Sequence, residues 1–577
     1  MMKKLTPYIG EYKKWVILSP IFMILEVLCE IVMPRLMASI VDVGIANGDM
    51  AHIIKMGLAM LALAALGMFF GIWGAKAGTA AGQGFGANLR NAMFQKIQDF
   101  SFADIDRFSS ASLITRTTND VNVMQMTLTM AVRMVVRAPT MLIAALFMAV
   151  SINAQLAMVL FVTIPILLLA VGIIMKVCNA LFEALQQKID SLNNAVQENL
   201  IAVRVVKAFV RSGYEKTKFK KANEDLCEAG VTVAMRIVAI MPVMTLCLNG
   251  ATLAVLYLGG SQVMAGDMLY GDLSSFINYI GQILMSVMMV GMSLLQVSRS
   301  VACARRLVEV LDTEPDIQDK AGSGDLPAPR GQVEFRDVSF KYQASGTGDD
   351  VLEHISFTVR PGQFAAIVGG TGTGKSSLVN LIPRFYDVTG GQVLVDGMDV
   401  RDYPIEELRS RIGMVLQNNV LFSGTIRENL LWGRPDATEE EMIQAARDAQ
   451  AYDFVMGLPD GFDTVLDQGG TNVSGGQKQR LCIARAMLRK PAILILDDST
   501  SAVDSATEAA IRESFAKNLK DTTVIIIAQR ISSVRYADKI LVLDDGVIAG
   551  EGTHEELMAD NGIYQEIYNS QQEGVGE

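Results

Sequence analysis

Long apolar stretches separated by polar segments run through the first half of the chain. Six of these stretches approach or exceed the roughly 20 residues that a helix needs to cross a hydrocarbon core. They fall near residues 16–40, 53–78, 130–152, 155–177, 234–263 and 270–297. The two longest polar segments, about 79–129 and 178–233, still carry apolar residues at helical spacing. The pattern therefore predicts about six transmembrane helices with long helical extensions outside the membrane.

The second half of the chain carries shorter apolar runs separated by turns, which is typical of an α/β domain. Residues 312–331, between the two halves, are polar and rich in Pro and Gly, which predicts a linker. Hydrophobic residues make up 51% of the whole chain, too many for an ordinary soluble enzyme. We therefore expect a membrane α-helical domain at 1–311, a linker at 312–331 and a soluble domain at 332–577.

The distribution of charge predicts how the membrane domain is oriented. Lys and Arg gather in the two longest polar segments and are missing from the short connections 41–52, 152–155 and 264–271. Because loops rich in Lys and Arg stay in the cytoplasm, we expect those two segments, both termini and the soluble domain on that side. The net charge of −11 favours solubility of the second half, and the lack of a basic stripe argues against nucleic acid as a partner.

Each of the two longest polar segments is expected to turn back through a short helix that lies roughly parallel to the membrane. These helices are predicted near 105–117 and 211–222. Ser109 or Ser110 is the predicted N-cap of the first helix, because a Ser hydroxyl accepts a hydrogen bond from an unpaired amide of the first turn. The two helices serve either as solvated connectors or as docking surfaces for the second domain.

Two pairs of charged residues fall within the predicted spans. Glu26 and Glu30 are four residues apart and so share one face of the first span, and Arg133 and Arg137 have the same spacing in the third. One interpretation is ion pairing between helices, which lowers the cost of placing charge in a membrane. The other is that Glu26 and Glu30 line an inward-open cavity and favour cationic substrates.

The strongest motif of the second half is GGTGTGKS at 369–376, which matches the phosphate-binding pattern G-x-x-x-x-G-K-[ST] between a strand and a helix. Glycines let backbone amides surround phosphate oxygens, Lys375 reaches the β and γ phosphates, and Ser376 can bind Mg²⁺. The motif therefore predicts a nucleotide-binding domain with ATP and Mg²⁺ as its ligands. The predicted phosphate-binding residues are Gly369, Gly370, Thr371, Gly372, Thr373, Gly374, Lys375, Ser376 and Ser377.

Two further motifs follow the first. The apolar strand ILILDD ends near Asp497, whose carboxylate is suited to the water shell of Mg²⁺. The segment VSGGQ at 473–477 places paired glycines before a helix, which predicts a second anion-binding corner made by Ser474, Gly475, Gly476 and Gln477. Because the motif at 369–376 already binds the phosphates of the chain's own nucleotide, this corner is predicted to bind a nucleotide held by another copy.

With these motifs in place, residues 333–560 resemble the nucleotide-binding domain of an ABC transporter, and residues 1–311 resemble the membrane domain of ABC exporters with the type IV fold. The resemblance implies that Tyr342 stacks on adenine, that Gln417 contacts Mg²⁺ and the membrane domain, and that Asp504 belongs to the D-loop. It also implies that the two short helices are coupling helices and that the chain lies in the bacterial cell (inner) membrane. The implied metal-binding residues are Ser376, Gln417 and Asp497.

Two positions depart from the family pattern. Asp498 stands where most members have a Glu that orients the attacking water, and a carboxylate retracted by about an ångström can lower the rate on the order of 10²-fold. Gln529 stands where the family has His, and an amide can donate a hydrogen bond but carries no charge. With Gln417, these two residues are the predicted catalytic positions. The departures indicate either harmless variation in a slow site or a site that binds ATP and hydrolyses it weakly.

A chain whose site binds ATP and hydrolyses it weakly resembles the degenerate-site subunit of heterodimeric bacterial multidrug exporters. It implies ATP-driven export of a small hydrophobic or amphipathic substrate, by this chain together with a different, catalytically complete half-transporter in membrane lipid. The intact segment 474–477 would then complete the partner's site. The alternatives are a homodimeric exporter of lipid or peptide, an ATP-gated channel or regulator, and an importer that uses the exporter fold.

Overall fold

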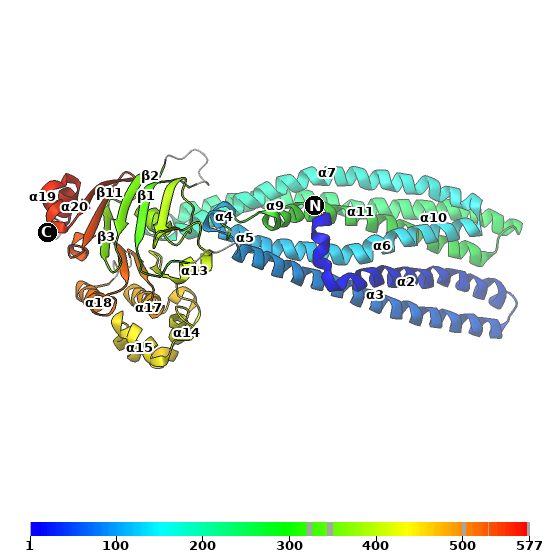
Figure 1. Cartoon of the computed structure of the whole chain (residues 1–577). Helices are drawn as coiled ribbons and strands as arrows, with labels where there is room; N and C mark the ends of the chain where they lie inside the picture. The colour runs from blue at the N-terminus through cyan, green and yellow to red at the C-terminus, as the bar shows by residue number, and fades with distance from the viewer. Residues whose placement is uncertain (1, 320–325, 343–349, 499–502, 529, 574–577) are drawn as a thin grey trace. The chain divides into compact units, whose positions relative to one another are not determined.

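The structure, a computed structural model, describes residues 2–319, 326–342, 350–498, 503–528 and 530–573 (Figure 1). Contacts between residues divide the chain into two compact units. The first consists of Met1–Lys96 and Ala111–Thr313, and the second of Ile97–Ser110 and Glu314–Glu577. A short piece from the membrane half of the sequence therefore belongs to the second unit.

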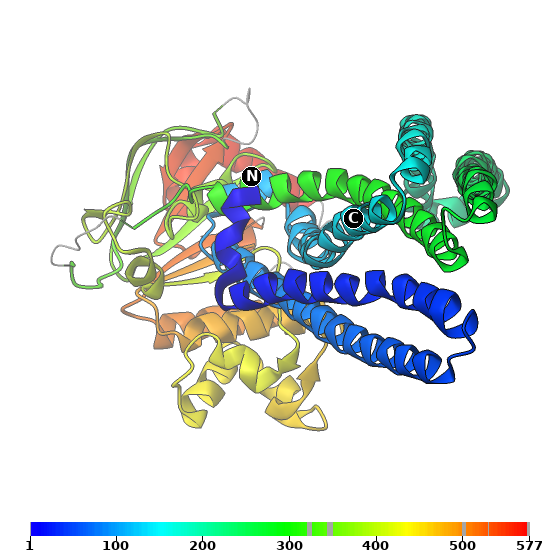
Figure 2. The same cartoon turned by 90° about the vertical axis from the view of Figure 1, so that its right-hand side faces the viewer.

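The first unit consists of long helices that run side by side along their length (Figure 1). They are α2 (Lys13–Ser39), α3 (Met50–Gln98), α6 (Val121–Ile152), α7 (Ala154–Ile201), α9 (Ser212–Val238), α10 (Ile240–Ala265) and α11 (Tyr270–Asp312), with the shorter α1 (Met2–Leu5), α5 (Ser110–Thr115) and α8 (Val203–Ala208). Figure 2 shows α2 and α3 as a pair joined at one end.

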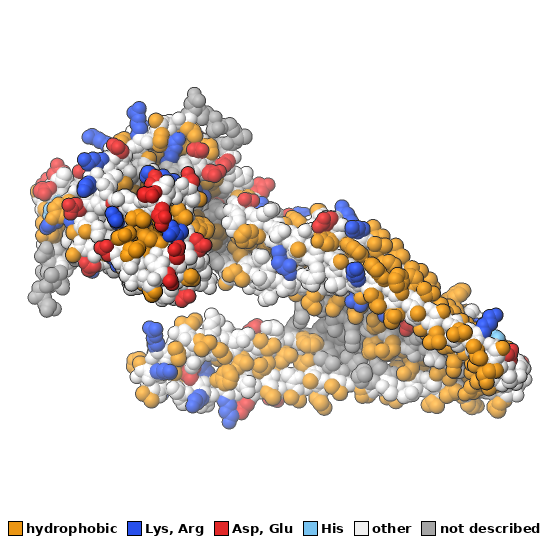
Figure 3. Space-filling view, turned by 90° about the horizontal axis from the view of Figure 1, so that it is seen from below, with side chains coloured by type: hydrophobic (Ala, Val, Ile, Leu, Met, Phe, Trp, Pro, Cys, Tyr) orange, Lys and Arg blue, Asp and Glu red, His pale blue; other side chains and the backbone are white. Residues whose placement is uncertain are grey.

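Five helical stretches in the described part of the chain are long and apolar enough to cross a membrane. They are Met2–Ile45, Met50–Gln98, Ser110–Ile152, Thr245–Ala265 and Tyr270–Val290, and Ala154–Ala170 is apolar but shorter. Apolar side chains cover the outside of these helices (Figure 3), with Leu61, Met68 and Ile143 each about two-thirds exposed. The arrangement is compatible with the predicted six spans, and the chain is an integral membrane protein.

Glycines on α3 allow this helix to lie close to α2 and α6. Gly74, Gly78, Gly82 and Gly86 recur every four residues, so they occupy one face. All four are buried, and a Cβ atom at Gly82 would lie 2.0 Å from the Thr129 hydroxyl of α6. Small residues at this spacing let membrane helices approach one another, where van der Waals contact drives their association.

The first predicted short helix is present as α4 (Phe102–Phe108), but its N-cap is Ser101 and not Ser109 or Ser110. The Ser101 side chain accepts from the Asp104 amide, and the Asp104 carboxylate accepts from the Ser101 amide, which forms a capping box. Ser109 lies at the C-terminal end of α4 with φ 58°, a geometry that ends a helix. The S-x-x-D spacing at 101–104 was the sequence signal for the cap.

The second short helix was predicted about eight residues too late. Residues 212–222 belong to α9, which runs without a break to Val238. The chain turns earlier, through α8 and through Val210, which has φ 53°. No proline separates 211 from 222, so local sequence does not interrupt a helix there.

Two main sheets form the centre of the second unit. The larger one contains β3 (Phe364–Gly369), β6 (Ile412–Val415), β9 (Ile493–Asp497), β10 (Thr523–Ile527), β11 (Lys539–Asp544) and β12 (Val547–Gly552) in the order β12-β11-β3-β10-β9-β6. Its strands are parallel except for β12, which is antiparallel to β11. The smaller, antiparallel sheet contains β1 (Val333–Phe340), β2 (Leu352–Val359), β4 (Gly390–Val395) and β5 (Met398–Asp399) in the order β2-β1-β4-β5.

Helices cover the larger sheet on one face, with α17 and α18 below it in Figure 1. The helices of this unit that follow β3 are α12 (Lys375–Asn380), α13 (Ile405–Ser410), α14 (Ile426–Leu431), α15 (Glu439–Asp448), α16 (Tyr452–Met456), α17 (Gly475–Leu488), α18 (Ser505–Asn518), α19 (His554–Asp560) and α20 (Gly562–Glu573). Successive residues of β9 point to opposite faces: Leu494 and Leu496 join the core on the helix side, while Ile493 and Ile495 join the core shared with the smaller sheet. This burial on both faces explains why the strand is apolar throughout.

Candidate functional site

The parallel strands bring the predicted nucleotide-binding motifs to one edge of the larger sheet. In the register of β10, Ile527 pairs with Ile367 of β3 on one side and with Asp497 of β9 on the other. The segments that leave the carboxyl ends of these strands therefore start next to one another. In open α/β sheets this edge is where ligands bind.

The loop 369–374 turns sharply between β3 and α12. Gly372 and Gly374 have φ values of 87° and 92°, which side chains rarely adopt, and a Cβ on Gly374 would lie 2.9 Å from the carbonyl oxygen of Val351. The Lys375 ammonium folds back over this loop and donates to the carbonyl oxygens of Gly369, at 3.0 Å, and Gly370. Burial lowers the pKa of Lys375, against the opposing effect of two carboxylates. The ammonium is thus held where a phosphate would lie.

Those carboxylates belong to Asp497 and Asp498. The Ser376 hydroxyl donates to Asp497 Oδ1 at 3.1 Å, so the predicted metal-binding hydroxyl and carboxylate lie together. Asp497 is buried and Asp498 half-buried, and burial raises the pKa of both side chains. The Asp498 carboxylate is also hydrogen-bonded by Gln417, which connects the end of β6 with the end of β9.

Asp498 has an unusual backbone conformation. Its φ is 48°, in the left-handed region, which Asp and Asn tolerate better than most residues. Its amide donates to the Ile527 carbonyl at 3.1 Å, so the end of β10 holds this turn. Strand β10 therefore fixes the backbone position from which the Asp498 side chain, one methylene shorter than Glu, extends. The predicted switch residue Gln529 lies outside the described residues.

The protein groups fit Mg²⁺ together with a nucleotide. In the described part of the chain, no group of three or more His, Cys, Asp or Glu could hold a metal ion alone. Mg²⁺ commonly takes only one or two protein oxygens and completes its shell with phosphate oxygens and water. Ser376 and Asp497 supply such a pair, whereas Gln417 is engaged with Asp498.

Tyr342 lies beside the helix that follows the loop. Its hydroxyl is 2.8 Å from the hydroxyl of Ser377, and its ring contacts Phe340 edge to face at 4.9 Å. The structure thus places the aromatic ring predicted to contact adenine next to the predicted phosphate-binding segment.

The segment 474–477 begins α17 through a second capping box. The Ser474 side chain accepts from the Gln477 amide, and the Gln477 side chain accepts from the Ser474 amide at 2.9 Å. The paired glycines follow the cap directly, so the first amides of a 14-residue helix lie beside them. Asp504 caps α18 in a similar way, accepting from the Thr507 amide at 2.9 Å, and these hydrogen bonds lower its pKa.

Within the first unit, the structure joins Glu26 and Glu30 to one arginine. Arg137 donates through Nη1 to Glu26 at 3.0 Å and through Nη2 to Glu30 at 2.8 Å. The arrangement is the interhelical ion pairing that was one of the two interpretations. Arg133 lies instead against Gly78 of α3. The second carboxylate oxygen of Glu26 is buried without a hydrogen-bond partner.

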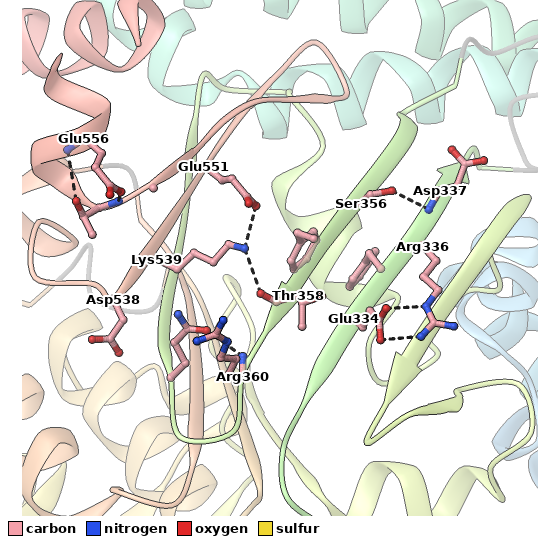
Figure 4. A pocket seen from close by; sticks show the side chains of 15 residues that line it. Glu334, Arg336, Asp337, Ser356, Thr358, Arg360, Asp538, Lys539, Glu551 and Glu556 are labelled. Carbon is pink, nitrogen blue, oxygen red and sulfur yellow. Dashed lines mark hydrogen bonds and ion pairs between the residues drawn. The ribbon is translucent and has the colours of Figure 1, made fainter. Parts of the chain in front are cut away.

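A polar hollow of about 880 Å³ lies between the two sheets (Figure 4). Lys539 forms an ion pair with Glu551 at 2.9 Å and donates to the Thr358 carbonyl, while Arg336 pairs with Glu334. None of the predicted nucleotide-binding residues lines this hollow. Lys539 and Arg336 are each paired with a carboxylate, and no residue that lines the hollow belongs to the phosphate-binding loop 369–376 (the P-loop).

Sequence reasoning missed how α4 is attached within the second unit. The Tyr386 hydroxyl donates to the Asp106 carboxylate at 2.8 Å, and the ring of Phe102 lies 4.5 Å from that of Phe385. The Asp104 carboxylate accepts from the Asp316 amide at 3.2 Å. These contacts join segments more than 200 residues apart, and no local spacing indicates them.

Family models match both halves of the chain. Residues 16–287 match the ABC transporter transmembrane region, and residues 352–501 match the ABC transporter model. A solved structure of a bacterial Atm1-family ABC exporter with ATP bound is similar to this chain with a TM-score of 0.80 and 26% identity, over 97% of this chain and 99% of that one.

Curated relatives extend over nearly the same length. An ABC transporter ATP-binding protein from Bacillus subtilis (strain 168) is 39% identical, covering 99% of this chain and 98% of its own. An ATP-dependent lipid A-core flippase from Syntrophus aciditrophicus (strain SB) is 35% identical over 86% and 82% of the two chains. A fatty acid ABC transporter ATP-binding/permease protein from Mycobacterium bovis is 37% identical over 83% and 75%.

Proposed function

Because the chain belongs to the ABC transporter family, we propose that it is one half of an exporter that uses ATP to move a small hydrophobic or amphipathic substrate out of a bacterial cell. Its ABC domain binds ATP, and members of the exporter group are ATP-hydrolysing translocases. The nucleotide-binding domain, both termini and the coupling helices lie in the cytoplasm in this proposal. The observation that carries it is the meeting of Lys375, Ser376 and Asp497 at one sheet edge.

We assign the site residues as follows. The loop 369–377 and Lys375 hold the phosphates, and Tyr342 supports the adenine ring. Ser376 and Asp497 would hold Mg²⁺, with Gln417 joining them once it leaves Asp498, and the ion would neutralise charge on the phosphates. Asp498 and Gln529 would act on the attacking water and the γ-phosphate. The corner 474–477 and Asp504 belong to the site of the partner chain.

Weak hydrolysis at this chain's own site follows from Asp498 in particular. The carboxylate is shorter than that of Glu, its backbone is held by Ile527, and its side chain is hydrogen-bonded by Gln417. Because both its backbone and its side chain are hydrogen-bonded, Asp498 cannot move towards an attacking water without breaking one of these contacts. This supports a heterodimer in which a different partner supplies the competent site.

The names of the relatives favour a lipid-like substrate within the proposed class. Two of them are named for lipid A-core and for fatty acid, both of which have a polar head and an apolar chain. A homodimeric lipid exporter is therefore the second candidate function. The two candidates differ in whether this chain hydrolyses ATP without another subunit.

The test is ATP hydrolysis by this chain purified alone in lipid, beside the double variant Asp498→Glu with Gln529→His. We expect very low turnover by the unchanged chain and a gain on the order of 10²-fold in the variant, because Glu restores the reach of the carboxylate. Lys375→Ala in the variant background controls for contaminating ATPases and should abolish the gain. Rapid turnover by the unchanged chain would contradict the degenerate site and favour the homodimer.

A further inference from the structure

The short helix α4 is attached to the nucleotide-binding unit at two points. Near its N-terminus, the buried Asp104 carboxylate accepts from the Ser101 amide and from the amide of Asp316, which lies just after α11. Farther along, Asp106 accepts from the Tyr386 hydroxyl at 2.8 Å. Only residues 99–101 separate α4 from the long helix α3 along the chain.

Tyr386 belongs to an aromatic cluster that reaches the adenine-contacting residue. Its ring lies 5.2 Å from that of Tyr342 at 89°, and 5.7 Å from that of Phe340. Tyr342 in turn lies with its hydroxyl 2.8 Å from that of Ser377, directly after the P-loop. Two hydrogen bonds and one edge-to-face contact thus connect the P-loop with α4 without a gap.

Tyr342, Tyr386 and Asp106 also line a common hollow of about 610 Å³ within this unit. The Tyr386 hydroxyl is in a demanding environment, because burial and the Asp106 carboxylate both raise its pKa, so it stays protonated and remains a donor. A hydrogen bond from a hydroxyl to an ionised carboxylate, as between Tyr386 and Asp106, is stronger than one between two neutral groups. The contact is therefore suited to hold α4 in one position.

We propose that Tyr386 is a positioning residue that couples nucleotide contact at Tyr342 to the placement of α4 through its hydrogen bond to Asp106. This inference rests on the proposed nucleotide site. A base that stacks on Tyr342 constrains that ring, and the ring is in edge contact with Tyr386. Because the Tyr386 ring carries its hydroxyl at the far end, a tilt of the ring changes the geometry of the bond to Asp106. Coupling of this kind needs a physical element that both sites bias, and the Tyr386 side chain is that element.

Hydrogen exchange of the α4 amides tests the proposal. The full-length chain in lipid nanodiscs is compared with and without the non-hydrolysable nucleotide AMP-PNP and Mg²⁺. In the unchanged chain we expect the nucleotide to slow exchange across 102–108. In Tyr386→Phe, which keeps the ring and removes the donor, we expect most of that slowing to disappear, a change of about 2- to 10-fold for one hydrogen bond.

Matched variants separate the bond from general effects on folding. Tyr403→Phe removes another buried tyrosine hydroxyl, which donates to the Val395 carbonyl at 2.9 Å, and should leave the slowing intact. Asp106→Ala should behave like Tyr386→Phe, whereas Asp106→Asn keeps an acceptor oxygen and should restore most of the effect. The affinity for AMP-PNP should stay within about two-fold in all of them, since none removes a nucleotide contact.

The possible outcomes distinguish the proposed nucleotide site from the proposed coupling through Tyr386. Failure of the unchanged chain to bind AMP-PNP would overturn the proposed nucleotide site and this inference with it. Binding without any change in α4 exchange, or an equal change in Tyr386→Phe and Tyr403→Phe, would overturn the inference and leave the nucleotide site standing.

Discussion

The pair of adjacent carboxylates at the end of β9 shows how single residues define this protein's site. Asp497 and Asp498 are partly removed from water, and burial is the main cause that raises the pKa of each. A folded-state pKa above the unfolded value means that ionisation opposes folding. The site therefore keeps charges that are costly for stability, as expected where function requires them.

Replacing Asp498 with Asn should stabilise the nucleotide-binding unit at neutral pH while it removes the carboxylate. Because the pKa of Asp498 is raised, the unchanged chain gains stability as pH falls from above the folded-state pKa towards the unfolded value of about 3.9. The advantage of Asn should thus be largest near pH 7 and shrink as pH falls. Thermal unfolding at several pH values, without nucleotide, measures it.

Asp545→Asn is the matched control for that comparison. Asp545 also has a positive φ, 41°, but is exposed. It reports any benefit of Asn in the left-handed conformation alone. Equal shifts for the two variants, or a shift for Asp498→Asn that does not depend on pH, would contradict the role of burial.

At the scale of elements, helix ends and helix contacts decide how the long helices are arranged. The cap at Ser101 starts α4 close to the point where α3 ends, and it buries both the hydroxyl and the Asp104 carboxylate. The glycine face of α3 determines its approach to α6. Both features depend on small side chains at particular positions.

Ser101→Ala should destabilise α4, because the amide of Asp104 loses its partner inside the protein. A lost N-cap costs about 1 kcal/mol, which corresponds to about five-fold faster exchange of the first α4 amides. Ser110→Ala, at the exposed start of α5, should have little effect. If Ser110→Ala accelerated exchange of these amides and Ser101→Ala did not, the N-cap would be Ser110, as predicted from the sequence, and not Ser101.

Gly82→Ala should destabilise the membrane unit. The new Cβ would lie 2.0 Å from the Thr129 hydroxyl and 3.0 Å from the Gln125 carbonyl oxygen, so the helices must separate, at a cost of about 1–3 kcal/mol. Gly57→Ala on the same helix meets no atom within 4 Å and should be neutral or stabilising. Thermal unfolding in detergent compares the two, and equal midpoints would show that α3 does not depend on close contact there.

At the scale of the whole molecule, transport depends on what the membrane helices present to a substrate. Glu26 and Glu30 share Arg137, which leaves one more carboxylate than guanidinium in this group. A buried carboxylate oxygen without a hydrogen-bond partner, as at Glu26, is expensive within a membrane domain and is retained mainly for function. This supports the hypothesis that the group favours cationic substrates.

The double variant Glu26→Gln with Glu30→Gln should slow export of an amphipathic cation several-fold while it leaves a neutral analogue of similar size unchanged. The reason is that Gln keeps the side-chain volume and removes the charge. Transport into inverted vesicles that contain this chain, together with a second half-transporter if the proposed heterodimer requires one, measures both substrates. Glu11→Gln, at an exposed site in the N-terminal segment, is the control, and equal loss for both substrates would indicate a structural role only.

Local patterns predicted the elements that depend on local chemistry. Apolar length indicated the membrane helices, and the glycine spacing of 369–376 indicated the phosphate loop, because both follow from interactions between near neighbours. The predicted N-cap of α4 and the predicted position of the turn before α9 were wrong, because several serines and several possible turn positions satisfied the same local rules. The pairing of Arg137 with Glu26 and Glu30 was one of two open interpretations, because spacing alone does not tell which helix faces which.

Residue types and their spacing are enough to identify the family motifs, the two departures at Asp498 and Gln529, and the division into membrane and soluble halves. Three contacts are visible only in the folded chain: Gln417 is hydrogen-bonded to Asp498, Arg137 pairs with both glutamates, and Tyr386 is hydrogen-bonded to Asp106, 280 residues away. The two groups of features differ in how far along the chain the underlying interactions reach. Hydrophobic length and backbone conformation act within a few residues, whereas hydrogen bonds between distant side chains exist only after sheet order and helix packing have brought them together.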